Sequence, residues 1–287
     1  MRSPTRVAVG CVLATCRPRA SIFSTVPPPD AAAARSTLLD AIASFDAAIA
    51  ADGVPSIDFG VKGGELDGDT RAPRDLYQTG AYRAVSDRVG DAADAVIAAV
   101  DAAALVNPTA AATDKFGTAD GAASPLHGKW SNMFTTAADA VFSESSERGA
   151  ALVYNQVDGV SGRTTNCIDF LPRSSPVLRA VRQTAKPPTL ESLRVILSTT
   201  AVAANRIELV FRLVKARLNL RLFGRWPLKL TLFFPVPGPF LTRILFAFRP
   251  SKKPPPAFFD VLYLDDELRV HKTGQGNVFV QRRAAAA

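Results

Sequence analysis

Apolar and polar residues recur with two different periods along the chain. From residue 36 to 49, apolar positions return every three or four residues, as they do on one side of a helix, and Ser36 is suited to cap that helix. The same spacing returns between Asp75 and Leu105, before Asn107-Pro108 stops the helical pattern. The N-terminal half is therefore predicted to hold two helices.

From Trp130 onward the period changes to two, which is typical of strands with one buried face. Leu218, Leu220 and Leu222 show this alternation clearly, and it recurs within residues 228–232 and 259–265. Short glycine-containing turns separate these segments, at Asp158-Gly159, Ser161-Gly162, Gly224 and Gly274-Gln-Gly276. Eight or nine candidate strands lie between residues 129 and 282. We therefore predict a mainly β fold whose antiparallel sheet closes into a barrel, because closure removes exposed strand edges.

Charge is concentrated in one part of the chain. The 287 residues carry a net charge of +8, yet residues 206–253 alone carry eleven basic side chains and one acidic one. The rest of the chain is thus slightly acidic. Aromatic and aliphatic residues are interleaved with these basic side chains, and such a surface fits an anionic partner. Prolines and Arg243 exclude a membrane-spanning helix here, so a surface that lies on an anionic membrane fits better.

The candidate membrane-surface residues are Phe234, Phe240, Arg243, Phe246, Arg249, Lys252 and Lys253. Two other interpretations of this segment remain open. The basic residues are also compatible with the solvated face of ordinary strands. Basic residues beside aromatic ones also suit single-stranded nucleic acid, although the aliphatic surroundings favour lipid.

The first thirty residues resemble an organellar presequence. They contain four arginines and six serines or threonines, and residues 1–29 contain no acidic side chain. An apolar stretch from Val7 to Cys16 follows the first arginines, as in the core of a signal peptide. The two features together fit a bipartite plastid targeting presequence over residues 1–30, and a plain disordered tail is the alternative.

Nothing in the sequence indicates catalysis. The chain has no nucleophile elbow, phosphate-binding loop, dinucleotide fingerprint or metal-ligand spacing. Its three cysteines form no disulfide framework, because Cys11 and Cys16 lie in the presequence and Cys167 remains alone. We expect no cofactor, no metal and no enzymatic activity, with Cys167 a small strand residue.

The start of the first strand resembles that of lipocalin barrels. Gly128-Lys-Trp130 is similar to the Gly-x-Trp with which those barrels begin. That resemblance implies that the Trp130 indole closes one end of the barrel and contacts a late-strand arginine, with Arg269 the first candidate and Arg282 the second.

The last strands resemble those of the plastid-lipid-associated proteins, the PAP/fibrillin family. The run from Phe259 to Val280 contains Tyr-Leu-Asp, Leu-Arg, a basic residue before Thr-Gly, and Asn-Val-Phe-Val, in the family's order. Asn107-Pro-Thr109, Gly128-Lys-Trp130 and Val153–Val157 also match the family's order. Phe134 stands where the family usually has tyrosine, and Ala110 where it has a second proline.

The resemblance implies a lipocalin-like antiparallel β-barrel preceded by an α-helical N-terminal region. We expect a presequence at 1–30, a helical region at 35–107 and the barrel domain at 125–283. The implied ligand is a hydrophobic small molecule such as a quinone, tocopherol, carotenoid or fatty acid. The candidate ligand-binding residues are Trp130, Phe134, Gln156, Asn166, Phe211, Tyr263, Asp265 and Arg269.

Two versions of this function remain open. In one, the barrel interior holds the ligand. In the other, the interior is filled and the protein coats plastid lipid globules or thylakoid membranes. A basic RNA-binding module is a third and more distant alternative. Both lipid versions predict residence in the plastid, at lipid globules, at thylakoids or in the stroma.

Overall fold

The computed structural model describes residues 29–53, 57, 59, 81–137, 140–142, 149–172, 188–222, 226–236 and 257–284. Within them are two α-helices, α1 (Pro29–Asp52) and α3 (Asp87–Leu105), and two short 3₁₀ helices, η1 (Ala81–Ala84) and η2 (Gly121–Ala123). The strands are β1 (Gly128–Thr135), β2 (Ala151–Asp158), β3 (Arg163–Phe170), β4 (Leu190–Ala203), β5 (Arg206–Leu222), β6 (Trp226–Pro235), β7 (Ala257–Leu264), β8 (Leu268–Thr273) and β9 (Val278–Arg283).

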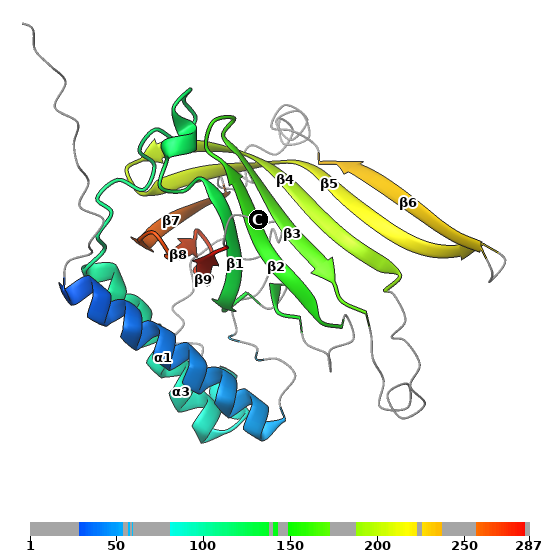
Figure 1. Ribbon diagram of the computed structural model, residues 1–287. Coiled ribbons are helices and arrows are strands. Elements are labelled where there is room, and N and C mark those ends of the chain that lie inside the picture. The colour runs from blue at the N-terminus through cyan, green and yellow to red at the C-terminus, as the bar shows by residue number, and fades with distance from the viewer. Residues whose placement is uncertain are drawn as a thin grey trace, which may run out of the picture.

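The strands form a closed antiparallel barrel, as predicted. The ladder runs β4-β3-β2-β1-β9-β8-β7-β5, and a further pairing of β4 with β5 closes the ring of eight strands. Strand β6 lies outside this ring. The first part of β5, residues 206–209, pairs with β7, while its second part, residues 213–222, pairs with β6. We call residues 213–222 and 226–235 the β5–β6 arm, which extends away from the barrel (Figure 1).

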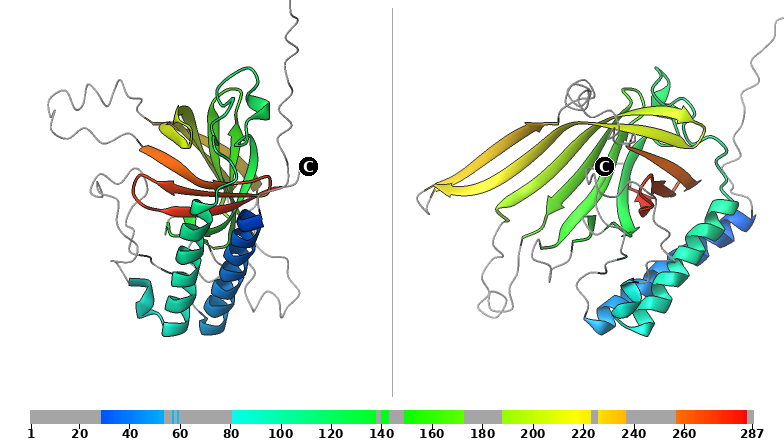
Figure 2. Two further views of the ribbon diagram at one scale, coloured as in Figure 1. Left: turned by 90° about the vertical axis from the view of Figure 1, so that its left-hand side faces the viewer. Right: turned by 180° about the vertical axis from the view of Figure 1, so that it is seen from behind.

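The two helices lie side by side against the outside of the barrel, at β1 and β7–β9 (Figure 2). The predicted apolar stripe of α1 is buried, with Leu38, Ile42 and Phe45 at most 5% exposed. Ser36 lies inside α1 and is not its cap, because the helix begins at Pro29, whose fixed φ suits a first turn.

Helix α3 begins later than its apolar spacing predicted. Ser86 caps it, since the Ser86 hydroxyl accepts a hydrogen bond of 3.2 Å from the Val89 N–H. The predicted start at Asp75 lies outside the described residues. The helix ends at Leu105, as predicted, and its buried face carries Val89, Ala93, Val96, Ile97 and Val100.

The predicted hairpin turns are present where the structure describes them. Asp158 to Gly162 connects β2 to β3, residues 265–267 connect β7 to β8, and Gly274 to Asn277 connects β8 to β9. The turn at Gly224 lies outside the described residues.

The connection from α3 to β1 covers one end of the barrel. Ala112, Phe116 and Leu126 from this connection pack with Trp130 and Val157 in a core inside the barrel. Gly121 and Gly159 let the connection cross the β2–β3 turn closely, because a Cβ at Gly121 would lie 2.1 Å from the Gly159 carbonyl oxygen. This end of the barrel is therefore closed by packed side chains.

Candidate functional site

Trp130 sits at the closed end and is fully buried. Its indole N–H donates a hydrogen bond of 2.9 Å to the Leu126 carbonyl oxygen. The Arg269 guanidinium carbon lies 5.0 Å from the Trp130 ring centroid, which confirms the first predicted partner. The second contact comes from Arg283, at 4.1 Å, and not from Arg282, which is exposed.

Arg269 belongs to a chain of side-chain amides inside the barrel. Its guanidinium donates to Gln281 Oε1 at 3.0 Å and to Asn155 Oδ1 at 2.8 Å. Gln281 Nε2 donates to the same Asn155 oxygen at 2.6 Å, and Asn155 Nδ2 donates to Asn166 Oδ1 at 2.7 Å. Burial, with a smaller contribution from nearby Arg283, lowers the pKa of Arg269 to about 9. The side chain is thus still a cation at neutral pH.

His271 lies next to Arg269 on the inner face of β8. Its ring stacks on Phe279 at a centroid distance of 5.0 Å and is tilted against Phe259 at 4.9 Å. Its Nδ1 is buried and has no hydrogen-bond partner among the residues that the structure describes. Burial, followed by the charge of Arg269, lowers the pKa of His271 well below its ordinary value, so the imidazole is neutral at pH 7.

Beyond this polar layer, the inner wall is apolar and only half-buried. The strand register places side chains of β2, β3, β4 and β5 on the same face as Asn155 and Asn166. These inward residues are Val153, Ile168, Leu193, Val195, Phe211 and Val214, and each keeps intermediate exposure. The barrel wall therefore offers an apolar surface that the described side chains do not fill.

A pocket of about 270 Å³ lies at the other end of the barrel, where β1 ends and β2 begins. Its lining includes Phe45 and Asp46 of α1, Asn132 of β1 and Val153 of β2. Partial burial raises the pKa of the Asp46 carboxyl, and Asn132 Oδ1 is buried with no hydrogen-bond partner within the described ranges. This end of the barrel is less completely packed than the end beneath Trp130.

The predicted ligand-binding residues divide between the two faces of the sheet. Trp130, Asn166, Phe211 and Arg269 face inward. Phe134 and Tyr263 face outward and pack with the helices, which corrects their predicted place beside the others. The cause is a register shift in each strand, between Asn132 and Phe134 in β1 and between Val261 and Tyr263 in β7. A bulge adds one residue and sends the following side chains to the opposite face.

Gln156 was also predicted at the interior, and its side chain is exposed on the outer face. Its neighbour Asn155 is the inward residue, because Asn155 pairs with Trp130 in the ladder. Sequence alternation alone cannot distinguish two adjacent polar residues in a strand. Asn155, Gln281 and His271 are thus interior polar residues that the alternation of apolar and polar positions did not indicate.

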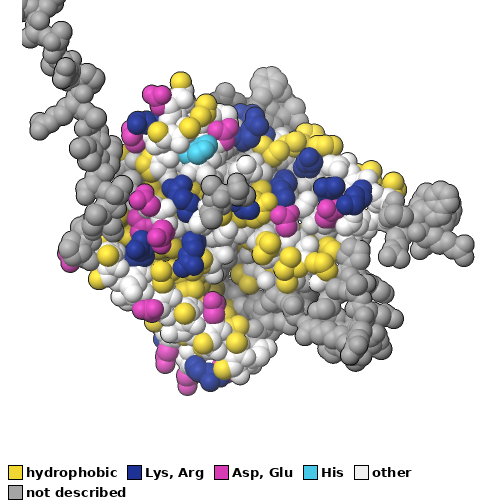
Figure 3. Space-filling view, viewed as in Figure 1, with side chains coloured by type: hydrophobic (Ala, Val, Ile, Leu, Met, Phe, Trp, Pro, Cys, Tyr) yellow, Lys and Arg dark blue, Asp and Glu magenta, His cyan; other side chains and the backbone are white. Residues whose placement is uncertain are grey.

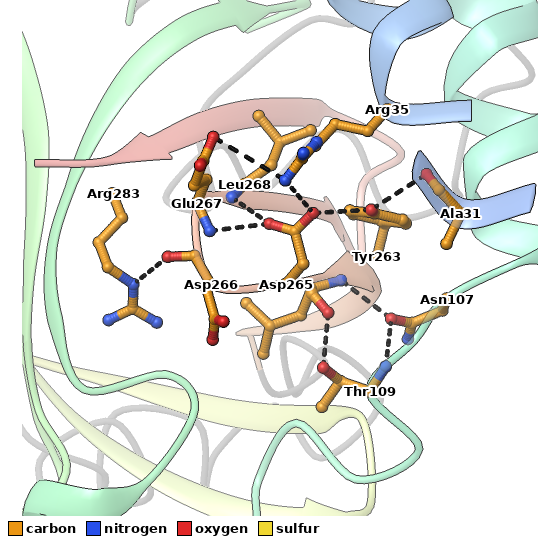
Figure 4. Close-up of polar contacts among 11 residues, drawn as sticks. Ala31, Arg35, Asn107, Thr109, Tyr263, Asp265, Asp266, Glu267, Leu268 and Arg283 are labelled. Atoms are coloured by element: carbon orange, nitrogen blue, oxygen red, sulfur yellow. Dashed lines mark hydrogen bonds and ion pairs between the residues drawn. The ribbon is translucent and has the colours of Figure 1, made fainter. Parts of the chain in front are cut away.

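Asp265 lies outside the barrel and joins the β7–β8 turn to helix α1 (Figure 4). Its Oδ1 accepts hydrogen bonds from the backbone N–H groups of Glu267, at 2.8 Å, and Leu268, at 2.6 Å. Its Oδ2 lies 3.2 Å from Arg35 Nη1 and 2.7 Å from the Tyr263 hydroxyl. Burial and this hydrogen bond raise the pKa of Tyr263. Asp265 is therefore an anchor for the helix and does not face the interior.

Asn107, just after the end of α3, contacts the end of β7 beside the same turn. Asn107 Oδ1 accepts hydrogen bonds from the backbone N–H groups of Leu264, at 2.9 Å, and Thr109, at 3.1 Å (Figure 4). The Asn-Pro-Thr sequence thus fixes the passage from helix to barrel.

The β5–β6 arm has one apolar face and one basic face. Phe234, Leu232, Leu230 and Leu228 pair with inward-facing residues of β5 and continue the inner wall of the barrel. The opposite face carries Lys215, Arg217 and Lys229, and Figure 3 shows lysine and arginine side chains along this arm. Glu191 of β4 offsets part of this charge, because its Oε2 lies 3.4 Å from Arg217 Nε and 3.7 Å from Lys229 Nζ. On the apolar face, Leu228, Leu230 and Phe234 are 42%, 39% and 52% exposed.

Of the predicted membrane-surface residues, Phe234 lies on this apolar face. Phe240, Arg243, Phe246, Arg249, Lys252 and Lys253 lie outside the described residues. Among the helices that the structure describes, none is long and apolar enough to cross a membrane. The described side chains also contain no group of three or more histidine, cysteine, aspartate or glutamate residues suited to hold a metal ion.

Comparison with known proteins identifies the family. The family model PAP_fibrillin matches residues 79–282. No curated protein and no solved structure matches the chain significantly. Because the family match spans most of the chain, from before α3 into β9, the chain belongs to the PAP/fibrillin family of plastid-lipid-associated proteins.

Proposed function

We propose that the barrel interior binds one hydrophobic small molecule, of the class of quinones, tocopherols, carotenoids or fatty acids, without chemical conversion. The observation that carries this proposal is the half-buried apolar wall formed by β2–β5. Ligand sites of this kind are mostly apolar, with a few polar groups that orient the ligand. The amide chain from Arg269 to Asn166 supplies polar groups at the closed end.

A hydrophobic ligand would stabilise the barrel by removing this wall from water. Burial of apolar surface contributes about 25 cal/mol per Å². Val195 and Phe211 are on neighbouring strands and on the same inner face, so a long apolar chain can contact both.

The test is lipid content and rebinding. The full chain, purified without organic solvent, should carry about one lipid per barrel in native mass spectrometry. After delipidation it should bind the fluorescent fatty acid cis-parinaric acid. Val195→Gln places an amide on the inner wall and should weaken this binding, whereas Thr200→Gln, on the exposed outer face of β4, should not. Absence of both bound lipid and probe binding would contradict an interior site.

A second function, docking on a lipid surface, is favoured by the two faces of the β5–β6 arm. An element with an apolar face and a basic face can lie in the membrane interface, with the apolar side toward the acyl chains. Basic residues near an anionic surface contribute about 1 kcal/mol each. Lys215 Nζ also lies 5.5 Å from the Phe233 ring centroid, so a cation and an aromatic ring lie together on the basic face of the arm.

Vesicle binding separates the two contributions. Changing Lys215, Arg217 and Lys229 to glutamine should remove the salt-sensitive part of binding to anionic vesicles. Changing Leu230 and Phe234 to serine should lower the salt-insensitive part. Leu152→Ser is the matched control, because Leu152 is 58% exposed and lies away from the arm, on β2. Equal binding by all variants would exclude the arm as the docking surface.

A further inference from the structure

The closed end of the barrel contains positive charge that no carboxylate in the described part of the chain pairs with. Arg269 is 2% exposed, and its hydrogen bonds go to the neutral side chains of Gln281 and Asn155. Arg283 donates to the carbonyl oxygens of Asp266, His127 and Pro125. Both arginines lie on the same tryptophan ring, so two cations are close together.

The nearby carboxylates offset this charge only in part. Asp265 already forms an ion pair with Arg35 and accepts hydrogen bonds from the Tyr263 hydroxyl and from the backbone of its own turn. Asp265 and Asp266 act electrostatically on Arg283, whereas the charge that acts on Arg269 is that of Arg283 itself. The side of the closed end that faces the barrel interior therefore has a positive potential, which favours an anionic group.

His271 adds a hydrogen-bonding atom with no partner at the same place. Its side chain is 7% exposed, and no donor or acceptor in the described part of the chain reaches its Nδ1. His271 follows Arg269 by two residues on β8, so the two side chains share the inner face. Buried polar atoms are nearly always hydrogen-bonded, so this nitrogen requires an explanation such as a ligand atom.

The position of His271 suits contact with a ligand. Phe279, on which its ring stacks, keeps intermediate exposure, whereas Val261, opposite His271, and Leu264, opposite Arg269, are buried. His271 thus lies where the packed closed end gives way to the half-buried apolar wall. Nδ1 itself is covered by protein atoms, so a ligand group reaches it only when the His271 ring turns toward the apolar wall. A group bound there would have the Arg269 charge on one side and the apolar wall on the other.

We infer that the interior selects an amphipathic lipid with a carboxylate head, which accepts a hydrogen bond from His271 Nδ1 and is attracted by Arg269, while its chain lies along β3–β5. This inference rests on the proposed interior site and specifies its ligand chemistry. A neutral imidazole donates from one nitrogen, and the tautomer with its proton on Nδ1 provides the donor. The carboxylate then supplies the negative charge that the closed end lacks.

Three lipid probes that share one acyl chain and differ in the head group test this inference. Oleate, oleyl alcohol and methyl oleate are titrated into the delipidated full chain at pH 7.5. Oleate should bind at least about ten-fold more tightly than the ester or the alcohol, and each tenfold corresponds to about 1.4 kcal/mol. In His271→Phe, which keeps an aromatic ring against Phe279, oleate should lose this advantage while methyl oleate binds as before. Lys272→Gln removes an exposed neighbouring cation and should change nothing.

A second readout does not depend on the variant. Oleate labelled with ¹³C at its carboxyl carbon should show a lower carboxyl pKa when bound, because a nearby guanidinium favours the ionised form. If the protein binds all three probes equally and the bound carboxyl pKa is not lowered, the carboxylate inference is wrong and the interior lipid site stands. If it binds none of them, the interior site fails as well. If His271→Phe does not fold, the preference of the parent chain and the ¹³C titration decide.

Discussion

The guanidinium of Arg269 lies 5.0 Å from the ring centroid of Trp130, at the closed end of the barrel, where both side chains are buried. This contact joins β1 to β8, which are separated in the sheet by β9. Trp130→Ala should lower the free energy of unfolding by about 3–5 kcal/mol, because it leaves a cavity and removes the ring beneath two arginines. Denaturant unfolding monitored by far-UV circular dichroism measures the loss. Phe233→Ala, at a site 58% exposed, should change stability by less than about 1 kcal/mol.

Two adjacent aspartates in the β7–β8 turn should respond differently to the same substitution. Asp265→Asn weakens the contacts with Arg35 and with two backbone N–H groups, and should cost about 2–3 kcal/mol. Asp266→Asn should cost less than about 1 kcal/mol, because the Asp266 side chain is exposed and acts on Arg283 through its charge, while the hydrogen bond to Arg283 uses the Asp266 carbonyl oxygen, which asparagine keeps. Thermal unfolding of the two variants side by side gives the comparison. Similar losses would show that Asp265 is not the anchor of α1.

Acidification should destabilise the protein partly through His271. The pKa of His271 is lowered in the folded state, mainly by burial. In the unfolded chain, a histidine side chain binds its proton near pH 6.5. Below that pH the unfolded state binds more protons, so stability is lost as the pH falls, with a slope of about 1.4 kcal/mol per pH unit from this group. The difference in unfolding free energy between the parent and His271→Phe should therefore change between pH 7 and pH 5. A constant difference over this range would contradict a neutral buried imidazole.

The N-terminal residues are expected to target the protein to the plastid. A fusion of residues 1–35 to a fluorescent reporter should enter the plastid when expressed in a photosynthetic cell. The reason is the arginine-rich and hydroxyl-rich composition without acidic side chains in residues 1–29. Replacing Arg2, Arg6, Arg17 and Arg19 with glutamine is the matched control and should reduce import. A reporter that stays in the cytosol or is secreted would contradict the presequence.

Local patterns in the sequence were sufficient to predict the strands, the barrel type and one interior contact of this protein. The period of two predicted the alternation of β5 and β6, because each side chain of a strand faces away from its neighbours. The Gly-x-Trp and the C-terminal run identified the barrel type, and they placed Trp130 against Arg269 correctly. These features depend on residues close together in the chain, or on one long-range pair that the resemblance supplied.

Other features were decided only by the tertiary structure. Phe134 and Tyr263 changed faces because bulges in β1 and β7 reverse the alternation, and a bulge is set by the pairing partner. The division of β5 between β7 and β6 follows from where two other strands end, so one continuous alternating segment serves both the barrel and the arm. The alternation determined which side chains share a face. Only the closure of the barrel decided which face became the interior, because that choice depends on contacts among strands far apart in the chain.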